Sequence, residues 1–145
     1  MSSLLISWPF WAVLSAVFAA LTAILAKAGV EGVASDVATF LRTLVVVAVT
    51  GALLAASGQW RLLTAVPGRS TLFLVLSGLA TGASWLCYFR ALALGDAARV
   101  APLDKLSVVF VALFGVLLLG ERLSVINWLG IALIAAGAVL AAIKG

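Results

Sequence analysis

The stretch VAPLDKLSVVFVALFGVLLL, residues 100–119, decides the fold of this chain. It is almost wholly apolar and long enough, at about 1.5 Å per helical residue, to cross a hydrocarbon core of ~30 Å. Two adjacent charged residues, Asp104 and Lys105, interrupt it. An ionisable residue inside a membrane span costs from a few to more than about ten kcal/mol and usually marks a transport path. The stretch therefore indicates a membrane helix with a functional feature in it.

Four other stretches are similarly long and apolar, at residues 8–26, 37–56, 71–94 and 125–143. The chain is 66% hydrophobic and 10% charged, with a mean hydropathy of +1.32. Soluble domains carry roughly a quarter charged residues, so the ordinary soluble class is excluded. Since lipid offers the backbone no hydrogen bonds, each stretch must be helical. We predict an all-α membrane protein in which residues 1–145 form one domain of five transmembrane helices.

Residues at the ends of these stretches predict where the helices begin. Ser35 or Asp36 can cap the second helix, and Ser124 can cap the fifth. Pro102 lies near the start of the predicted fourth helix, where proline is tolerated. The connections are short, so any chemistry must lie within the helices.

Several classes of function find no support in the composition. No nucleophile–base pair or phosphate-binding glycine loop is present, so we expect neither an enzyme nor a cofactor. The chain has no His, and its single Cys, Cys87, lies in an apolar stretch, which argues against a metal site. The basic residues are scattered one per loop and form no stripe, so we expect no nucleic-acid partner.

A five-helix meander places its two ends on opposite sides of the membrane. We call the side of the first residues near and the other side far. The near side carries Arg61, Arg69 and Arg122, and the far side carries Lys27, Arg99 and Lys144, with Arg42 and Arg90 close to it. The positive-inside rule needs a clear excess of Lys and Arg on one side. Neither side has a clear excess, so dual topology, meaning insertion in both orientations, is a hypothesis. We expect the protein to lie in the cell membrane, which in bacteria is the inner membrane.

Charges within the helices gather in the far half of the membrane: Lys27, Arg42, Arg90, Asp104 and Lys105. One interpretation is a water-filled, net positive vestibule that leads toward the midplane. The other is that the long basic side chains extend to the far-side head groups.

Asp104 is too short to reach the head groups, so it must be protonated, face water or pair with a cation. We expect that cation to be Arg42, Arg90 or Lys105 of another helix or subunit. Adjacent helical residues project about 100° apart, so Asp104 and Lys105 of one chain should not simply neutralise one another. Asp104 and Lys105 therefore have two alternative roles, as part of a transport site or as a structural ion pair that fastens helices.

A polar and aromatic stripe follows the third helix at spacings of three and four residues, formed by Thr81, Ser84, Trp85 and Tyr88. Such a stripe can line a cavity at the midplane, where carriers bind their substrates. It can equally be a structural feature, in which the polar side chains hydrogen-bond between helices and an aromatic residue packs in the core.

Three segments resemble the EamA-type domain of the drug/metabolite transporter superfamily. They are FLRTLVVVAVT at residues 40–50, CYFRALALGDAARVAPLDKLSVVF at 87–110 and LLLGERLSVINWLGIALIAAGAVLAA at 117–142. The resemblance covers nearly the whole chain. Typical members have a proline within the fourth helix, whereas Pro102 is predicted at the start of that helix and is followed by Asp104 and Lys105.

The resemblance implies half of a ten-helix fold, because most members carry two such domains as inverted repeats around a central cavity. A chain with one domain is then expected to form a homodimer, and an antiparallel one would reproduce the fused architecture. The implied function is secondary transport of a small organic solute across the bilayer by alternating access. Because of its charge within the span, and not because of the resemblance, Asp104 is our candidate for proton coupling or for orienting the site. Lys105, Arg42 and Arg90 could hold an anionic group, and Trp85 and Tyr88 could contact the solute. The alternative is a membrane scaffold or accessory subunit that transports nothing itself, including one serving a lipid-linked flippase.

Overall fold

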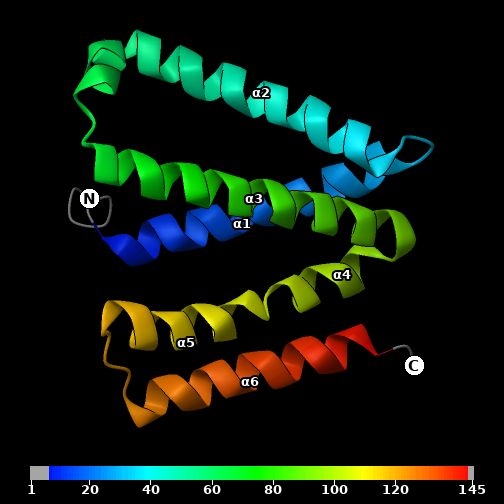
Figure 1. Cartoon of the computed structure of the whole chain (residues 1–145). Coiled ribbons are helices and arrows are strands. Elements are labelled where there is room, and N and C mark those ends of the chain that lie inside the picture. Colours follow the sequence, from blue (N-terminus) through cyan, green and yellow to red (C-terminus); the bar gives the residue numbers. More distant parts are fainter. Residues whose placement is uncertain (1–6, 144–145) are drawn as a thin grey trace. The chain divides into compact units, whose positions relative to one another are not determined.

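A computed structural model describes residues 7–143, which are helical almost throughout (Figure 1). The elements are α1 (Trp8–Val30), α2 (Ser35–Ala56), the short 3-10 helix η1 (Gln59–Ala65), α3 (Gly68–Leu94), α4 (Ala97–Asp104), α5 (Ser107–Leu119) and α6 (Val125–Ala142). Lys144, counted above on the far side, lies outside the described residues.

Within residues 7–143, five helical segments are long and apolar enough to span a membrane, with α4 and α5 together forming the fourth. The predicted fold class is thus confirmed. The second, third and fourth spans begin at Ser35, Gly68 and Ala97, two or three residues before the predicted starts. The apolar pattern marks only the part of a helix that meets hydrocarbon, and the helical backbone continues into a polar first turn.

The chain divides into two compact units. One holds α1 up to Lys27 together with α4, α5 and α6, and the other holds α2, η1 and α3 up to Ala93.

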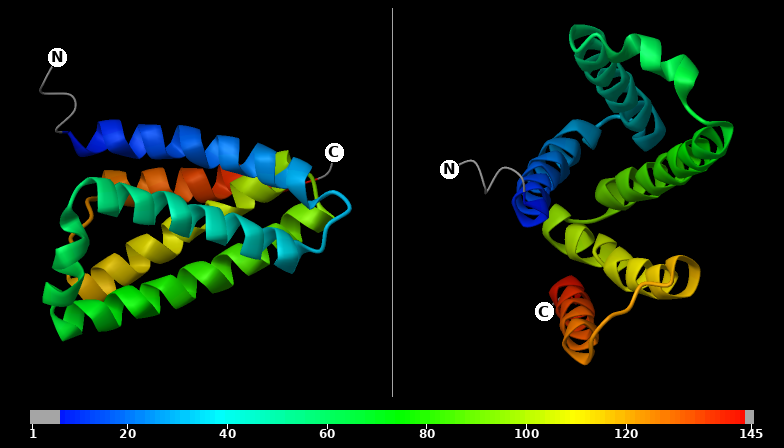
Figure 2. Two further views of the ribbon diagram at one scale, coloured as in Figure 1. Left: turned by 90° about the horizontal axis from the view of Figure 1, so that it is seen from above. Right: turned by 90° about the vertical axis from the view of Figure 1, so that its left-hand side faces the viewer.

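In the first unit, α6 runs back along both α4 and α5 (Figure 1 and Figure 2). On α5 and α6 the buried residues are all small: Ala112 and Gly115 on α5, and Ala138 on α6. Small residues let membrane helices approach closely, which compensates for the weak hydrophobic drive between helices in lipid. Arg99 adds a polar link, because its Nε and Nη2 donate to the Ala142 carbonyl oxygen at 3.0 and 2.8 Å.

The turn between α5 and α6 is formed by Gly120 and Glu121. Gly120 has φ +70°, a left-handed conformation that ends helices and favours glycine. The backbone N–H groups of Gly120 and Glu121 both donate to the Gly115 carbonyl oxygen. Ser124 then caps α6 as predicted, since its Oγ accepts from the Asn127 backbone N–H at 3.2 Å.

In the second unit, α2 and α3 run antiparallel and are joined through η1 (Figure 1). The predicted cap of α2 is wrong. Ala34 holds the N-cap position without a side-chain hydrogen bond, and Ser35 and Asp36 lie inside the first turn. The reason is that the Asp36 carboxylate is engaged elsewhere, by an arginine of α3 and by the Ser35 hydroxyl.

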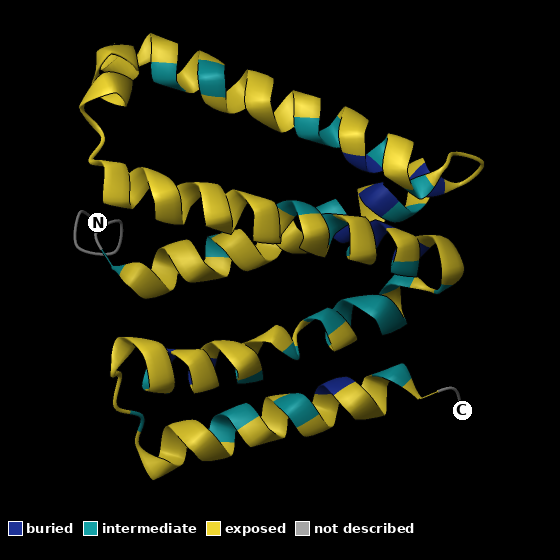
Figure 3. Cartoon of the chain, viewed as in Figure 1, coloured by how far each residue is buried: buried dark blue, intermediate teal, exposed yellow. Residues whose placement is uncertain are grey.

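Most large apolar side chains of the spans are exposed on the single chain (Figure 3). This distribution is the one expected of helices whose outer surfaces meet lipid or another membrane chain.

Candidate functional site

The fourth span is broken at its two charged residues. Asp104 is the last residue of α4, Lys105 is the cap that follows with ψ −6°, and α5 begins only at Ser107. The backbone N–H groups of Lys105, Leu106, Val108 and Val109 each donate to the carbonyl three residues earlier, at 3.0 Å. This is 3-10 spacing in the middle of a span, and such a stretch often marks a functional hinge.

Pro102 lies inside α4, not at its start. The prediction placed it near the start because the apolar stretch begins at Val100, whereas the helix begins at Ala97. Pro102 has no N–H to donate, so the α-helical bond to the Ala98 carbonyl is missing just before the broken segment. A proline inside the fourth span also agrees with the family pattern described above.

Asp104 and Lys105 pair with each other, contrary to expectation, with 3.2 Å between Oδ2 and Nζ. The expectation assumed a continuous helix in which neighbours point about 100° apart. The backbone leaves that geometry at Lys105, and the long lysine side chain closes the remaining gap. Both side chains stay accessible, Lys105 at 58% and Asp104 at 37%.

Arg42 lies over two aromatic rings of α3. Its guanidinium carbon is 4.1 Å from the centre of the Trp85 ring and 5.5 Å from that of Phe89. Trp85 and Phe89 are four residues apart, so they share one helix face. A guanidinium above an aromatic face is attracted by the ring quadrupole, the more so where water is scarce. A contact with ring faces is not an ion pair, so the guanidinium keeps N–H groups that can donate to an oxygen.

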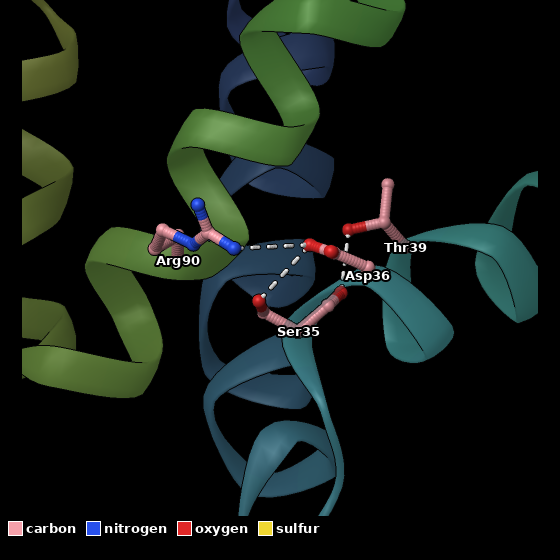
Figure 4. Close-up of polar contacts among 4 residues, drawn as sticks. All are labelled: Ser35, Asp36, Thr39 and Arg90. Carbon is pink, nitrogen blue, oxygen red and sulfur yellow. Dashed lines mark hydrogen bonds and ion pairs between the residues drawn. The ribbon is translucent and has the colours of Figure 1, made fainter.

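Arg90 pairs with Asp36, between Nη2 and Oδ1 at 3.8 Å (Figure 4). The Ser35 hydroxyl donates to the same carboxylate oxygen at 3.3 Å, and the Thr39 hydroxyl donates to the Ser35 carbonyl at 2.8 Å. The ion pair is long and both side chains are largely exposed, so it contributes little stability by itself. Its evident effect is to hold the first turn of α2 near the end of α3.

The stripe on α3 separates into different roles. The Thr81 hydroxyl donates to the Ser77 carbonyl of its own helix at 2.9 Å, a bond that needs no ligand. Ser84 is exposed, and Trp85 and Tyr88 are half-buried. Trp85 lies directly against the Arg42 side chain, and Tyr88 also interacts electrostatically with Arg42.

Sequence reasoning missed two residues of these constellations. Phe89 was recoverable, because it follows Trp85 by four residues and therefore lies on the same face. Asp36 was assigned to a cap, and only the arrangement of α2 and α3 shows it beside Arg90. Within residues 7–143, no group of three or more His, Cys, Asp or Glu side chains could hold a metal ion.

Comparison with known proteins identifies a family. The model of the EamA-like transporter family matches residues 6–143, in agreement with the resemblance of the three segments. A protein of Sinorhizobium sp described as "Uncharacterized transporter in cobO 3'region" is 66% identical over 137 residues, which cover 94% of this chain and 97% of that protein. No solved structure matches the chain.

Proposed function

Because this chain belongs to the EamA-like transporter family and is a multi-pass membrane transporter, we propose that it carries a small organic solute as a homodimer by alternating access. The family and the description of the relative point to transport, not to an enzymatic activity. The observation that carries the proposal is the broken fourth span with its Asp104–Lys105 pair. Carriers place substrate and ion sites at discontinuous helices, where the backbone can change shape.

The homodimer is supported by the count of spans. The described chain has five candidate spans, and the aligned region covers 97% of the Sinorhizobium protein, which therefore has about the length of one such domain. A carrier that rocks one repeat against another needs two repeats. An antiparallel pair of chains supplies them with opposite orientations, and the near balance of Lys and Arg at the two membrane faces is compatible with dual insertion.

Asp104 is our candidate for proton coupling. It is the eighth of the 23 residues of the fourth span, so its position along the helix places it within the membrane. When Asp104 is charged it holds Lys105 at 3.2 Å; when it is protonated the pair is lost and the 3-10 segment is free to change shape. This links one proton to one movement of the span without a metal or a cofactor.

The second unit supplies the proposed contacts to the solute. Trp85 and Tyr88 present half-buried aromatic rings from α3, and Arg42 is held against Trp85. Ser84 adds an exposed hydroxyl on the same helix. Thr81 contributes less, because its hydroxyl already donates to Ser77.

The test is transport by the purified chain in proteoliposomes. Labelled amino acids, organic acids and organic cations are offered one at a time, and uptake is compared with that of protein-free liposomes. We expect saturable uptake and counterflow of at least one class. If the protein moves nothing from the panel and none of these solutes raises its melting temperature, the carrier function is wrong and the scaffold reading takes its place.

A further inference from the structure

The strongest unexplained group in the second unit is the Arg42 guanidinium. Three other arginine or lysine side chains of the spans each have an oxygen partner: Arg90 has Asp36 at 3.8 Å, Arg99 has the Ala142 carbonyl at 2.8 Å, and Lys105 has Asp104 at 3.2 Å. Arg42 contacts aromatic rings instead. Among the described residues, no carboxylate lies within ion-pair distance of it.

The depth of Arg42 speaks against a side chain that simply reaches for the head groups. It is the eighth residue of α2, about 10 Å along the helix from Ser35. On α3, Trp85 lies nine residues and Phe89 five residues before Leu94, about 14 and 8 Å from that helix end. The guanidinium is closer to the deeper ring, that of Trp85. A side chain drawn to the far-side surface would favour the shallower one.

The geometry defines what the site can accept. Beside the Trp85 ring, Arg42 carries paired N–H groups that match the two oxygens of a carboxylate. One guanidinium balances one negative charge. A phosphate monoester carries nearly two at neutral pH, and Arg90, the residue after Phe89, is already paired with Asp36. The rings of Trp85 and Phe89 beside the charge favour an apolar body next to the anionic group.

We propose that Arg42, held on the Trp85 ring, binds the carboxylate of the transported solute, and that this solute is an organic monocarboxylate with an apolar body. The inference rests on the proposed carrier function and names its substrate class. It assigns Arg42 to substrate binding, and it leaves Arg90 and Lys105, the other two cations considered for an anionic group, to their ion pairs.

The experiment measures binding and counterflow with the intact protein in zwitterionic lipid. The probes are a series of aromatic and branched aliphatic monocarboxylic acids, each compared with its neutral amide and with a phosphate ester of similar body. Binding is measured by calorimetry and by the shift of the melting temperature. We expect the acids to bind, and the amides and phosphate esters to bind at least about tenfold more weakly.

The variant is Arg42→Lys, which keeps the charge but loses the planar edge and the stacking. We expect affinity for the acids to fall about tenfold or more. The matched control is Arg69→Lys, because Arg69 also lies over a ring of α3, that of Phe73 at 6.0 Å, but at the second residue of the helix. That control should bind like the wild type. If Arg42→Lys does not fold, Trp85→Leu, which removes the ring beside Arg42, should lower affinity for the acids in its place, and the comparison of acids with amides on the wild type still tests the substrate class.

Three results would overturn the inference. Transport of cations or neutral solutes, with no binding of any acid, would leave the carrier function standing and remove its substrate class. Equal binding of acids and amides would show that no charge is recognised. If vesicles containing phosphatidylglycerol stabilise the wild type but not Arg42→Lys, and the acids bind neither, the anion at Arg42 is a lipid head group. A protein that moves no solute at all contradicts the carrier function itself.

Discussion

At the scale of single residues, the four polar contacts described above have different consequences. We propose that the Asp104–Lys105 pair serves proton coupling and that Arg42, beside the Trp85 ring, serves anion binding. Arg90–Asp36 and Arg99–Ala142 use their groups to join helices. The sequence identified Arg42, Arg90, Asp104 and Lys105 as unusual, because charge in a span is visible in one dimension. Their partners were not predictable, since each cross-helix contact depends on which helix faces are neighbours.

Arg99 provides a test at this scale. Its two hydrogen bonds to the Ala142 carbonyl satisfy a group that the end of α6 leaves open. We predict that Arg99→Met, which keeps most of the apolar stem, lowers the free energy of unfolding by about 1.5–3 kcal/mol, the usual contribution of a hydrogen bond to a charged group. Unfolding in mixed micelles measures it.

The control for this prediction is Arg61→Met in η1, because Arg61 is exposed and its side chain, within residues 7–143, forms no ion pair or hydrogen bond with another helix. We expect Arg61→Met to be close to the wild type and Arg99→Lys to lie between. Equal stability of Arg99→Met and the wild type would show that the link between α4 and α6 is not significant.

At the scale of elements, the five spans were predictable, and the break in the fourth was not. Long apolar stretches determine the spans because lipid requires internal backbone hydrogen bonds. The stretch at residues 100–119 reads as one helix, and Pro102 was placed at its tolerated start. The three residues from Ala97, which put Pro102 inside α4, are too weakly apolar to register as membrane helix. η1 was missed for a related reason, since seven residues between two spans leave no periodic signal.

Pro102 yields the prediction for this scale. Pro102→Ala restores an N–H donor for the Ala98 carbonyl and favours a continuous α-helix through Asp104. We predict a stability equal to or above that of the wild type, by up to about 3 kcal/mol, together with a several-fold lower rate of transport. The melting temperature and the initial rate of uptake are the two measurements.

Pro67→Ala is the matched control, since Pro67 lies just before α3 and outside the spans. It should leave the rate unchanged. A Pro102→Ala protein that transports at the wild-type rate would exclude the broken segment as the moving element.

At the scale of the whole molecule, the proposed antiparallel dimer leads to a prediction about fused chains. Five spans put the two ends of one chain on opposite membrane sides. A short linker between two copies therefore inverts the second copy, whereas a linker containing one extra transmembrane helix keeps both copies parallel. We predict that the directly fused tandem transports and that the tandem with the extra helix does not, as measured by uptake in cells. Activity of the parallel tandem alone would contradict the antiparallel arrangement.

Family membership could be read from the sequence because the segments that carry it, including the Gly-Glu-Arg-Leu turn, are local. The substrate class could not be read from the sequence, because it depends on which charged side chains already have a partner in the folded chain. The two proposed roles, proton coupling by Asp104 and solute binding by Arg42, can be tested separately. Asp104 belongs to the first unit and Arg42 to the second.

The most direct measurement follows solute-driven proton movement in proteoliposomes that contain a pH-sensitive dye, with the wild type compared with Asp104→Asn and with Asp96→Asn as control. We predict that a transported solute changes the internal pH with the wild type and with Asp96→Asn, and that Asp104→Asn reduces this proton flux at least about tenfold, since the uncharged amide cannot exchange a proton. Proton flux that persists unchanged in Asp104→Asn would contradict the coupling role of Asp104 and leave the pair with Lys105 a structural one.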